Sequence, residues 1–193
     1  MVTTGIVRFA HTSSVLLIAL FSEACDAAEA PVVPRGMMSD MPFAFTAPNF
    51  AHGGAGVGYG APAAVGAALS NKKRGRLSVT IQGDGDFMYA PGVWWTAAHH
   101  RIPLLAVMHN NRAYHQEVMH IQRMGARHNR GITRAHIGTT IEDPNIDYAK
   151  IAQGMGIAAI GPITDPKDLG PALARAKAIV KGGEPVLVDV VTQ

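Results

Sequence analysis

Two short polar turns in the sequence have the residue types needed to hold a phosphate group and a metal ion. The first turn is Gly83-Asp84-Gly85-Asp86, and the second is Asn110-Asn111. The glycines around Asp84 leave backbone N–H groups open to a phosphate. Asp84 would repel a diphosphate unless a divalent cation lay between them, and Mg²⁺ prefers carboxylate, amide and phosphate oxygens. Together the turns predict a clamp for Mg²⁺ and a diphosphate, with Asp84 and Asn111 as oxygen ligands.

The elements that must position these turns alternate between helices and strands. Each turn alone is a weak signal, but the 24 residues from Asp86 to His109 hold one helix and one strand. Sheets of parallel strands joined by helices bind ligands outside the carboxyl ends of the strands, where both turns fall. We therefore predict an α/β fold with a parallel sheet flanked by helices on both faces. The expected strands are 77–81, 104–108, 157–160 and 185–191, and the expected helices are 61–69, 90–101, 114–124, 147–155 and 166–181.

The composition is that of a folded chain with a substantial core. Of the 193 residues, 48% are hydrophobic and 16% are charged, which excludes a disordered protein. The net charge of +3 is too small to indicate nucleic-acid binding without a basic patch on a nucleic-acid-binding fold. A single cysteine, Cys25, excludes a disulfide framework and a cysteine-ligated cluster, and the nine histidines lack the spacing of a zinc site.

Residues 1–50 are interpreted as an N-terminal extension or linker, and residues 51–193 as the domain that carries both turns. The apolar run 15–21 is far shorter than the roughly 20 residues that span a bilayer, so no membrane anchor is expected. This region loosely resembles a secretory signal, and the alternative is a strand or short helix packed on the domain. Residues 31–50 contain four prolines and are interpreted as irregular chain or a linker.

The two turns and their spacing resemble the cofactor motif of the thiamine-diphosphate-dependent enzymes, in which Asn-Asn follows Gly-Asp-Gly at this distance. The glycine-rich segment 53–60 and the expected helix after it also look like the corresponding segment of one branch of that family. This branch contains the acetolactate synthases, pyruvate decarboxylases and benzoylformate decarboxylases. The resemblance covers roughly residues 50–193 and implies the thiamine-diphosphate-binding fold, specifically its C-terminal, diphosphate-binding domain.

The resemblance also implies a set of cofactor-binding residues. Asp84, the side chain of Asn111 and the backbone carbonyl of Ala113 would bind Mg²⁺, and the backbone from Gly83 to Asp86 would cradle the diphosphate. Position 86 is often Ser in relatives, so Asp86 puts a side-chain contact with phosphate in question. Ala113 replaces a frequent glycine, a mild change for a carbonyl ligand. The full implied set is Gly83, Asp84, Gly85, Asp86, Asn111, Ala113 and Tyr114.

The first turn of the expected helix 114–124 carries the candidate catalytic residues. Glu117 falls where pyruvate-decarboxylase-like members carry a proton-handling glutamate, and acetolactate synthases usually have an apolar residue. The alternative is an acid that suits the dipole of a first helical turn. His115 and Gln116 are candidates for substrate contact. Between Arg112 and Ile141, five arginines accompany one acid, which indicates either a lid that steers an anionic substrate or a solvated face or subunit interface.

The resemblance also implies a glutamate from a separate pyrimidine-binding domain, and residues 1–50 are too short to be that domain. We therefore expect this domain on a partner chain or a missing segment, and an oligomeric enzyme. The expected activity is cytoplasmic, depends on thiamine diphosphate and Mg²⁺, and decarboxylates a 2-oxo acid or carries out carboligation, as acetolactate synthases do. The alternative is a non-catalytic binding or assembly subunit that retains the fold.

Overall fold

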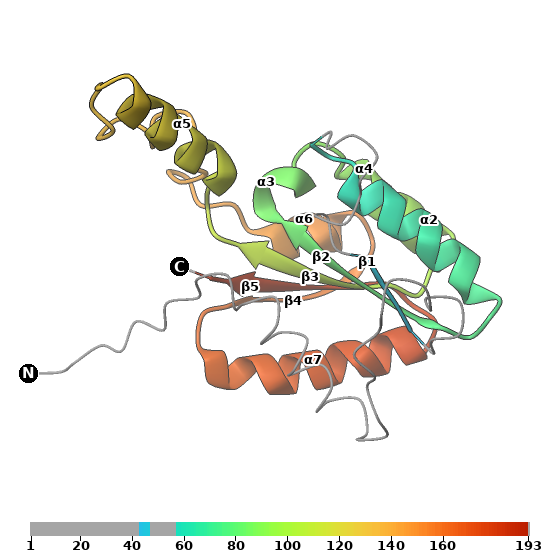
Figure 1. Cartoon of the computed structure of the whole chain (residues 1–193). Helices are drawn as coiled ribbons and strands as arrows, with labels where there is room; N and C mark the ends of the chain where they lie inside the picture. The colour runs from blue at the N-terminus through green and yellow to red at the C-terminus, as the bar shows by residue number, and fades with distance from the viewer. Residues whose placement is uncertain (1–42, 47–56, 193) are drawn as a thin grey trace, which may run out of the picture.

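Five parallel strands form the centre of the structure, a computed structural model that describes residues 43–46 and 57–192 (Figure 1). Their spatial order is β1-β2-β3-β5-β4. This order places the carboxyl ends of β2 and β3 side by side, with β5 as the next neighbour of β3. The strands are β1 (Phe43–Thr46), β2 (Leu77–Gly83), β3 (Leu105–Asn110), β4 (Ala158–Ile163) and β5 (Val186–Val191).

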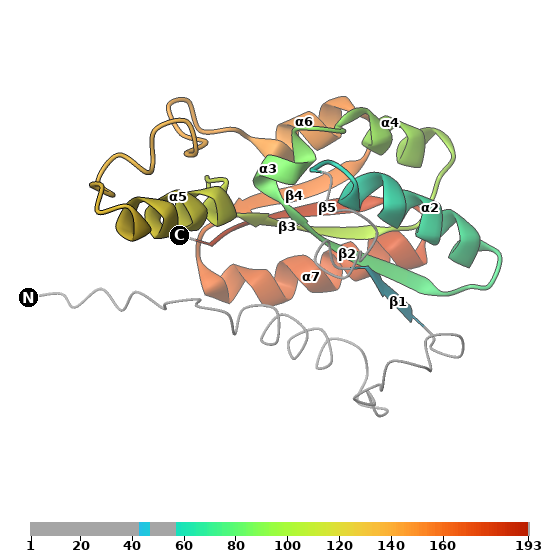
Figure 2. The same cartoon turned by 45° about the horizontal axis from the view of Figure 1, so that its top comes forward.

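Helices cover both faces of the sheet. Helix α7 lies along one face, and α2, α3, α4 and α6 lie on the other (Figures 1 and 2). This arrangement confirms the predicted α/β fold with a parallel sheet between two helical layers. The helices are α2 (Gly60–Lys72), α3 (Asp84–Phe87), α4 (Gly92–His99), α5 (His115–Arg127), α6 (Tyr148–Gly154) and α7 (Pro166–Lys181).

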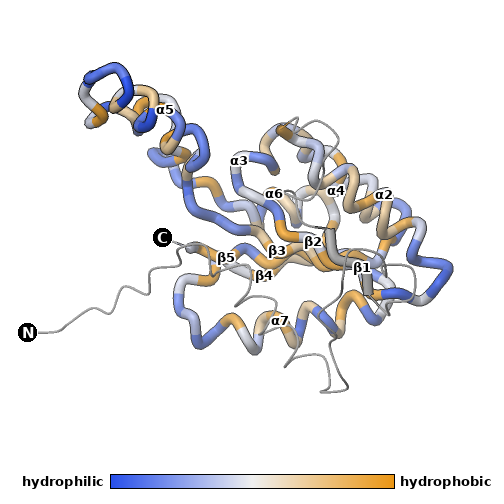
Figure 3. Tube along the Cα trace, viewed as in Figure 1, coloured by the Kyte–Doolittle hydropathy of each residue, from blue (hydrophilic) through white to orange (hydrophobic). Residues whose placement is uncertain are grey.

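The two helical layers enclose separate cores, because successive side chains of β3 and β5 point to opposite faces. Figure 3 shows hydrophobic residues along these central strands. On the α7 side, Val107 and Val188 pack with Leu173 of α7. On the other side, Met108 and Leu187 pack in a cluster that contains the buried residues Phe87, Trp94 and Tyr148. By the same alternation, the polar residues Asn110 of β3 and Asp189 of β5 lie on the face of the sheet that packs against Phe87 and Tyr148.

One local expectation differs from the structure. Residues 31–50 were expected to be irregular, but Phe43–Thr46 form edge strand β1, which pairs in parallel with Leu77–Thr80 of β2. Aromatic and β-branched residues favour such a strand in spite of the nearby prolines. The alternating residues Leu77, Val79 and Ile81 form β2 as predicted, and the neighbouring Thr80 and Gln82 are almost fully buried. Both faces of this strand are therefore covered.

Helix α5 projects from the body of the molecule (Figures 1 and 2). None of its residues is buried. The chain returns from it through residues 128–141 and joins the start of the helix at an isolated bridge between Ala113 and Thr140. We call residues 115–141 the α5 arm.

The apolar run 15–21 lies outside the described residues. Within residues 43–46 and 57–192, no helix combines the length and the apolar character needed to cross a membrane.

Candidate functional site

Asp84 lies at the turn from β2 into α3 with its side chain buried. Gly83 ends the strand with an extended backbone, and Asp84 begins the short helix at 2% exposure. Its Oδ1 accepts a 2.9 Å hydrogen bond from the Gly85 N–H, while its Oδ2 is buried without a hydrogen-bond partner. Burial raises the pKa of Asp84, and the backbone N–H groups of Gly85, Arg112 and Ala113 oppose that rise. One carboxylate oxygen is therefore available to a cation.

The neighbouring turn, from β3 into α5, folds against Asp84. Asn111 Oδ1 accepts a 3.1 Å hydrogen bond from the Ala113 N–H. Arg112 has a φ of +55°, in the left-handed region that non-glycine residues seldom adopt. Its carbonyl accepts a 2.7 Å hydrogen bond from Ile141, and the Tyr114 N–H donates to Thr139 at 2.8 Å. The return segment of the α5 arm thus holds the exit of this turn.

The register of the sheet explains why the two turns meet. Gly83, the last residue of β2, pairs with His109 of β3, so Asp84 and Asn110 leave the sheet at adjacent points. The backbone N–H groups of Arg112 and Ala113 then lie near the Asp84 carboxylate. The structure therefore brings together the two polar turns, as their positions after neighbouring strands predicted.

Tyr114 packs directly over the first turn. A Cβ atom at Gly85 would collide with the Tyr114 ring, so only glycine fits beneath it. The same ring makes an edge contact with Tyr89, with centroids 6.3 Å apart. Burial is the main cause of the raised pKa of the Tyr114 hydroxyl. Glycine at position 85 thus has a packing role in addition to the backbone exposure inferred from sequence.

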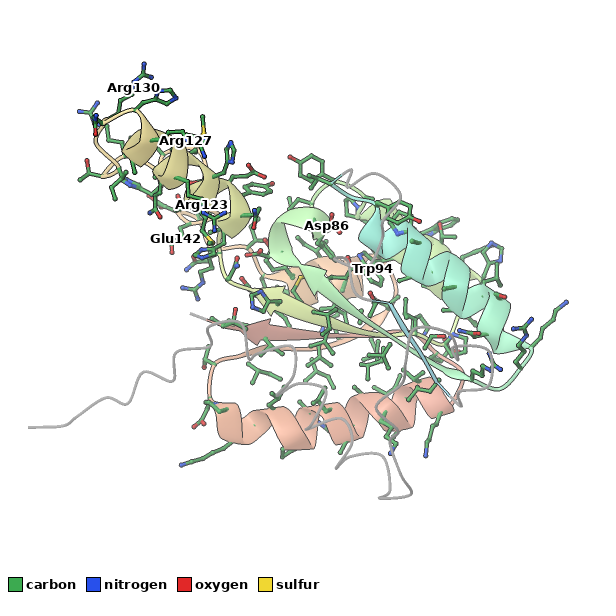
Figure 4. All side chains as sticks on the ribbon, viewed as in Figure 1. Asp86, Trp94, Arg123, Arg127, Arg130 and Glu142 are labelled. Carbon is green, nitrogen blue, oxygen red and sulfur yellow. The ribbon has the colours of Figure 1, made fainter. Side chains whose placement is uncertain are left out.

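Asp86 uses its carboxylate within the protein. Its Oδ1 accepts a hydrogen bond from the Gly58 N–H, and its Oδ2 is buried near Gly60, where α2 begins. Figure 4 shows Asp86 between α3 and α2. A Cβ atom added to Gly60 would lie 2.9 Å from Asp86 Oδ2, so glycine permits this close approach. Asp86 therefore links the Gly83–Asp86 turn to the glycine-rich segment before α2.

The candidate catalytic residues lie on the first turn of α5. His115, Gln116 and Glu117 are all exposed. Figure 4 shows Arg123, Arg127 and Arg130 farther along the α5 arm, toward its outer end. The α5 arm therefore combines an exposed candidate acid near the two turns with a basic outer part.

Sequence reasoning missed a buried polar pair behind the second turn. Asp189 of β5 is fully buried and accepts a 3.0 Å hydrogen bond from Asn110 Nδ2. Burial raises the pKa of Asp189 to about 6, and the hydrogen bond from Asn110 acts against the rise. The signal was a single acid within the otherwise apolar strand Val186–Val191, close to its carboxyl end.

The site offers oxygen ligands rather than a transition-metal set. Across the part of the chain that the structure describes, no three or more His, Cys, Asp or Glu side chains group together as a metal site. The free Oδ2 of Asp84, with the amide and backbone oxygens of the Asn111 turn, matches a hard cation such as Mg²⁺. Such a cation would also satisfy the unpaired buried oxygen.

Comparison with known proteins gives one family and several relatives. Residues 37–190 match the model of the thiamine pyrophosphate enzyme, C-terminal TPP binding domain. A Mycobacterium tuberculosis protein that carries the name of an acetolactate synthase large subunit, IlvX, is 36% identical over 138 residues. That alignment covers 72% of this chain and 25% of the relative. Benzoylformate decarboxylase of Pseudomonas aeruginosa is 33% identical over 139 residues, or 72% of this chain and 23% of the relative.

A solved structure agrees with these sequence relatives. The thiamine diphosphate-dependent 4-hydroxybenzoylformate decarboxylase of Rhodococcus jostii RHA1 is 29% identical and superposes with a TM-score of 0.58. The match covers 72% of this chain and 24% of that one. The chain thus spans about a quarter of the length of the relatives that it matches.

Proposed function

Because the chain belongs to the thiamine pyrophosphate enzyme family through the C-terminal TPP-binding domain, we propose that it forms the diphosphate and Mg²⁺ half of a site for 2-oxo acid chemistry. The reaction would be decarboxylation of a 2-oxo acid or carboligation. The observation that carries this proposal is the buried Asp84 carboxylate beside the Asn111 turn, whose Oδ2 has no hydrogen-bond partner.

Each predicted ligand has a role in this proposal. Asp84 Oδ2, Asn111 Oδ1 and the Ala113 carbonyl would bind Mg²⁺. The backbone N–H groups from Gly83 to Asp86 would bind the diphosphate, while the Asp86 carboxylate stays committed to Gly58.

Thiamine diphosphate, when bound, would supply carbanion chemistry for a 2-oxo acid. In this chain, Glu117 would hold or release a proton beside the reacting carbon, once a partner encloses the exposed first turn of α5. His115 and Gln116 would contact the substrate on the same turn. The basic outer part of the α5 arm would attract an anionic substrate toward the site.

The pyrimidine-binding half is proposed to come from a partner chain or from a segment outside this sequence, within an oligomer. The chain spans only about a quarter of its relatives' length, and α5 has no buried residue to anchor it on its own domain. A partner packed on α5 would enclose Glu117 and exclude water from the site. We also propose a cytoplasmic location, because both cofactors are intracellular.

The direct test is calorimetric titration of the chain with thiamine diphosphate, with and without Mg²⁺. Binding that requires Mg²⁺ and is lost in Asp84→Ala is the expected result. Asp168→Ala, which removes an exposed acid from α7 on the opposite face, is the matched control and should bind as the wild type does. Binding that survives Asp84→Ala unchanged would contradict the proposed clamp.

A non-catalytic assembly subunit is the second candidate, and the exposure of His115, Gln116 and Glu117 favours it. The two candidates differ in the effect of a pyrimidine-domain chain. If the chain is an enzyme component, adding that chain should tighten cofactor binding and produce CO₂ from a 2-oxo acid. An assembly subunit would bind the added chain without either effect.

A further inference from the structure

A buried hydrogen bond joins the last residue of β3 to the centre of the sheet. Asn110 and Asp189 are 3% and 0% exposed, and Asn110 Nδ2 donates to Asp189 Oδ1 at 3.0 Å. The amide oxygen of Asn110, Oδ1, and the other carboxylate oxygen of Asp189, Oδ2, are buried without a hydrogen-bond partner. Within the described part of the chain, this contact is therefore the one hydrogen bond that the side chain of either residue makes.

The surroundings hold Asp189 in place. On the β4 side, a Cβ atom at Gly161 would lie 3.0 Å from the Cβ of Asp189 and still closer to its backbone carbonyl. Gly161 has a φ of +125° and lies in the irregular stretch of β4 between Ile160 and Ile163. Glycine at position 161 thus allows β4 to pack closely against Asp189. This packing helps to fix Asp189, whose carboxylate accepts the hydrogen bond from Asn110.

The hydrogen bond acts on the residue that begins the second turn. Asn110 makes a second hydrogen bond on the same side. The N–H of Thr192, the residue after β5, donates to the Asn110 carbonyl at 2.9 Å. Asn111 follows immediately, and Thr139 and Ile141 hold the far end of the turn. Asp189 therefore fixes the entry of a turn whose exit is fixed by the α5 arm.

Stability alone gives a weak reason for an acid at this position. The rest of the strand is Val186-Leu187-Val188 and Val190-Val191, all apolar. Replacing buried polar pairs by well-packed apolar residues is often neutral or stabilising. The carboxylate at this position is thus better explained by the direction in which it holds the Asn110 side chain.

We propose that Asp189 is a positioning residue that orients the Asn111–Ala113 turn through its hydrogen bond to Asn110. Any contribution of Asp189 to cofactor binding rests on the function proposed above. Its effect on the conformation of the turn does not depend on that function. The acceptor oxygen does the positioning, so an uncharged residue with the same oxygen can replace Asp189. An apolar residue of similar size cannot.

The test compares Asp189→Asn, which keeps an acceptor, with Asp189→Leu, which removes it without branching at Cβ beside Gly161. Amide hydrogen exchange of the ¹⁵N-labelled full chain is measured by NMR at Ala113 and Thr192. We expect Asp189→Leu to accelerate exchange at both amides by about tenfold, the equivalent of one net hydrogen bond. Asp189→Asn should restore exchange to within about twofold of wild type, because the acceptor remains.

Ser78→Ala is the matched control for loss of a buried polar contact. It removes the hydroxyl of Ser78 on β2, which accepts a 3.2 Å hydrogen bond from Asn71 Nδ2 on α2, and it should leave the Ala113 and Thr192 amides unchanged. If Asp189→Leu does not fold, Asn110→Ala removes the same bond from the other side and takes its place. Unchanged exchange in these variants would overturn the proposal, and so would equal acceleration in Asp189→Asn or Ser78→Ala.

Thiamine diphosphate titration in Mg²⁺ forms the second arm of the test. Asp189→Leu should weaken binding by about tenfold and Asp189→Asn should not, again the effect of one hydrogen bond. If the wild type binds no cofactor even with a pyrimidine-domain chain present, the proposed function fails. The exchange measurements then still decide the positioning role by themselves.

Discussion

At the scale of single residues, Gly85 is the position where packing leaves least freedom. Gly85→Ala would place a methyl group against the Tyr114 ring, and we expect it to lower the free energy of unfolding by about 1–3 kcal/mol. Urea denaturation measures this change. Gly92→Ala is the control, since its added methyl group has open space around it, and it should be neutral or stabilising. Equal stability of the two variants would mean that Tyr114 does not pack over the turn.

Asp189 gives a prediction about pH. Its pKa in the folded chain is about 6, above the value of 3.8 expected when unfolded, so the native state binds more protons between these values. Its contribution to stability is therefore fully present below pH 3.8 and is lost as the pH rises through 6. Relative to wild type, Asp189→Asn should gain up to about 3 kcal/mol as the pH rises from 4 to 7.

Urea denaturation at several pH values checks this prediction. The buried Asp84 carboxyl has a raised pKa as well and contributes a change of the same sign, so the comparison with Asp189→Asn isolates Asp189. A difference between the two proteins that stays constant from pH 4 to 7 would show that Asp189 does not titrate in this range.

Some residues of the site were predictable and others were not, for a physical reason. Asp84 and Asn111 could be predicted because polar turns that follow apolar strands are visible in the sequence. Asp189 is equally polar, but its hydrogen bond joins residues 79 positions apart, and only the strand order shows that β5 lies next to β3. The hydrogen bond that the Asp86 carboxylate accepts was likewise not predictable, because its donor, the Gly58 N–H, is distant in the sequence.

At the scale of elements, helix α5 has apolar side chains that are not buried against the rest of the described chain. Val118, Ile121 and Met124 share one face of α5, and Ile121 is 43% exposed. Ile121→Glu should leave the free energy of unfolding within about 0.5 kcal/mol of wild type, because its side chain is largely solvated. It should weaken association with a pyrimidine-domain chain at least about tenfold, since a charge would enter the interface.

Sedimentation analysis of mixtures with a candidate pyrimidine-domain chain measures this association. Gln122→Glu introduces the same charge at the adjacent exposed position and should associate as the wild type does. If both variants associate like wild type, the apolar face of α5 is not the contact surface, and the partner must dock elsewhere.

The same elements show which features of the fold the sequence pattern could predict. Alternating helices and strands predicted the sheet and the long helices, and α7 spans the predicted residues 166–181. The pattern could not show features that depend on neighbouring elements. Thr80 and Gln82 are buried because α2 and α3 cover their face of β2, and the strand β1 is recognisable only through its pairing with β2.

At the scale of the whole molecule, the chain corresponds to the C-terminal TPP-binding domain of a family of longer proteins. It belongs to the thiamine pyrophosphate enzyme family and spans about a quarter of the relatives that it matches. Its described residues bring the two polar turns together at the carboxyl edge of the sheet, while the first turn of α5 stays open to solvent. We therefore propose that this chain anchors the cofactor and that a partner completes the site.

The most direct test is to locate the cation by NMR. Mn²⁺ replaces Mg²⁺ in oxygen sites and broadens nearby amide signals, so the ¹⁵N-labelled chain is titrated with Mn²⁺ and thiamine diphosphate, with a pyrimidine-domain chain present. The account predicts the strongest broadening at Gly85, Asn111 and Ala113, with the amides of α7 unaffected. Broadening centred on any other part of the chain, or none at these three residues, would contradict it.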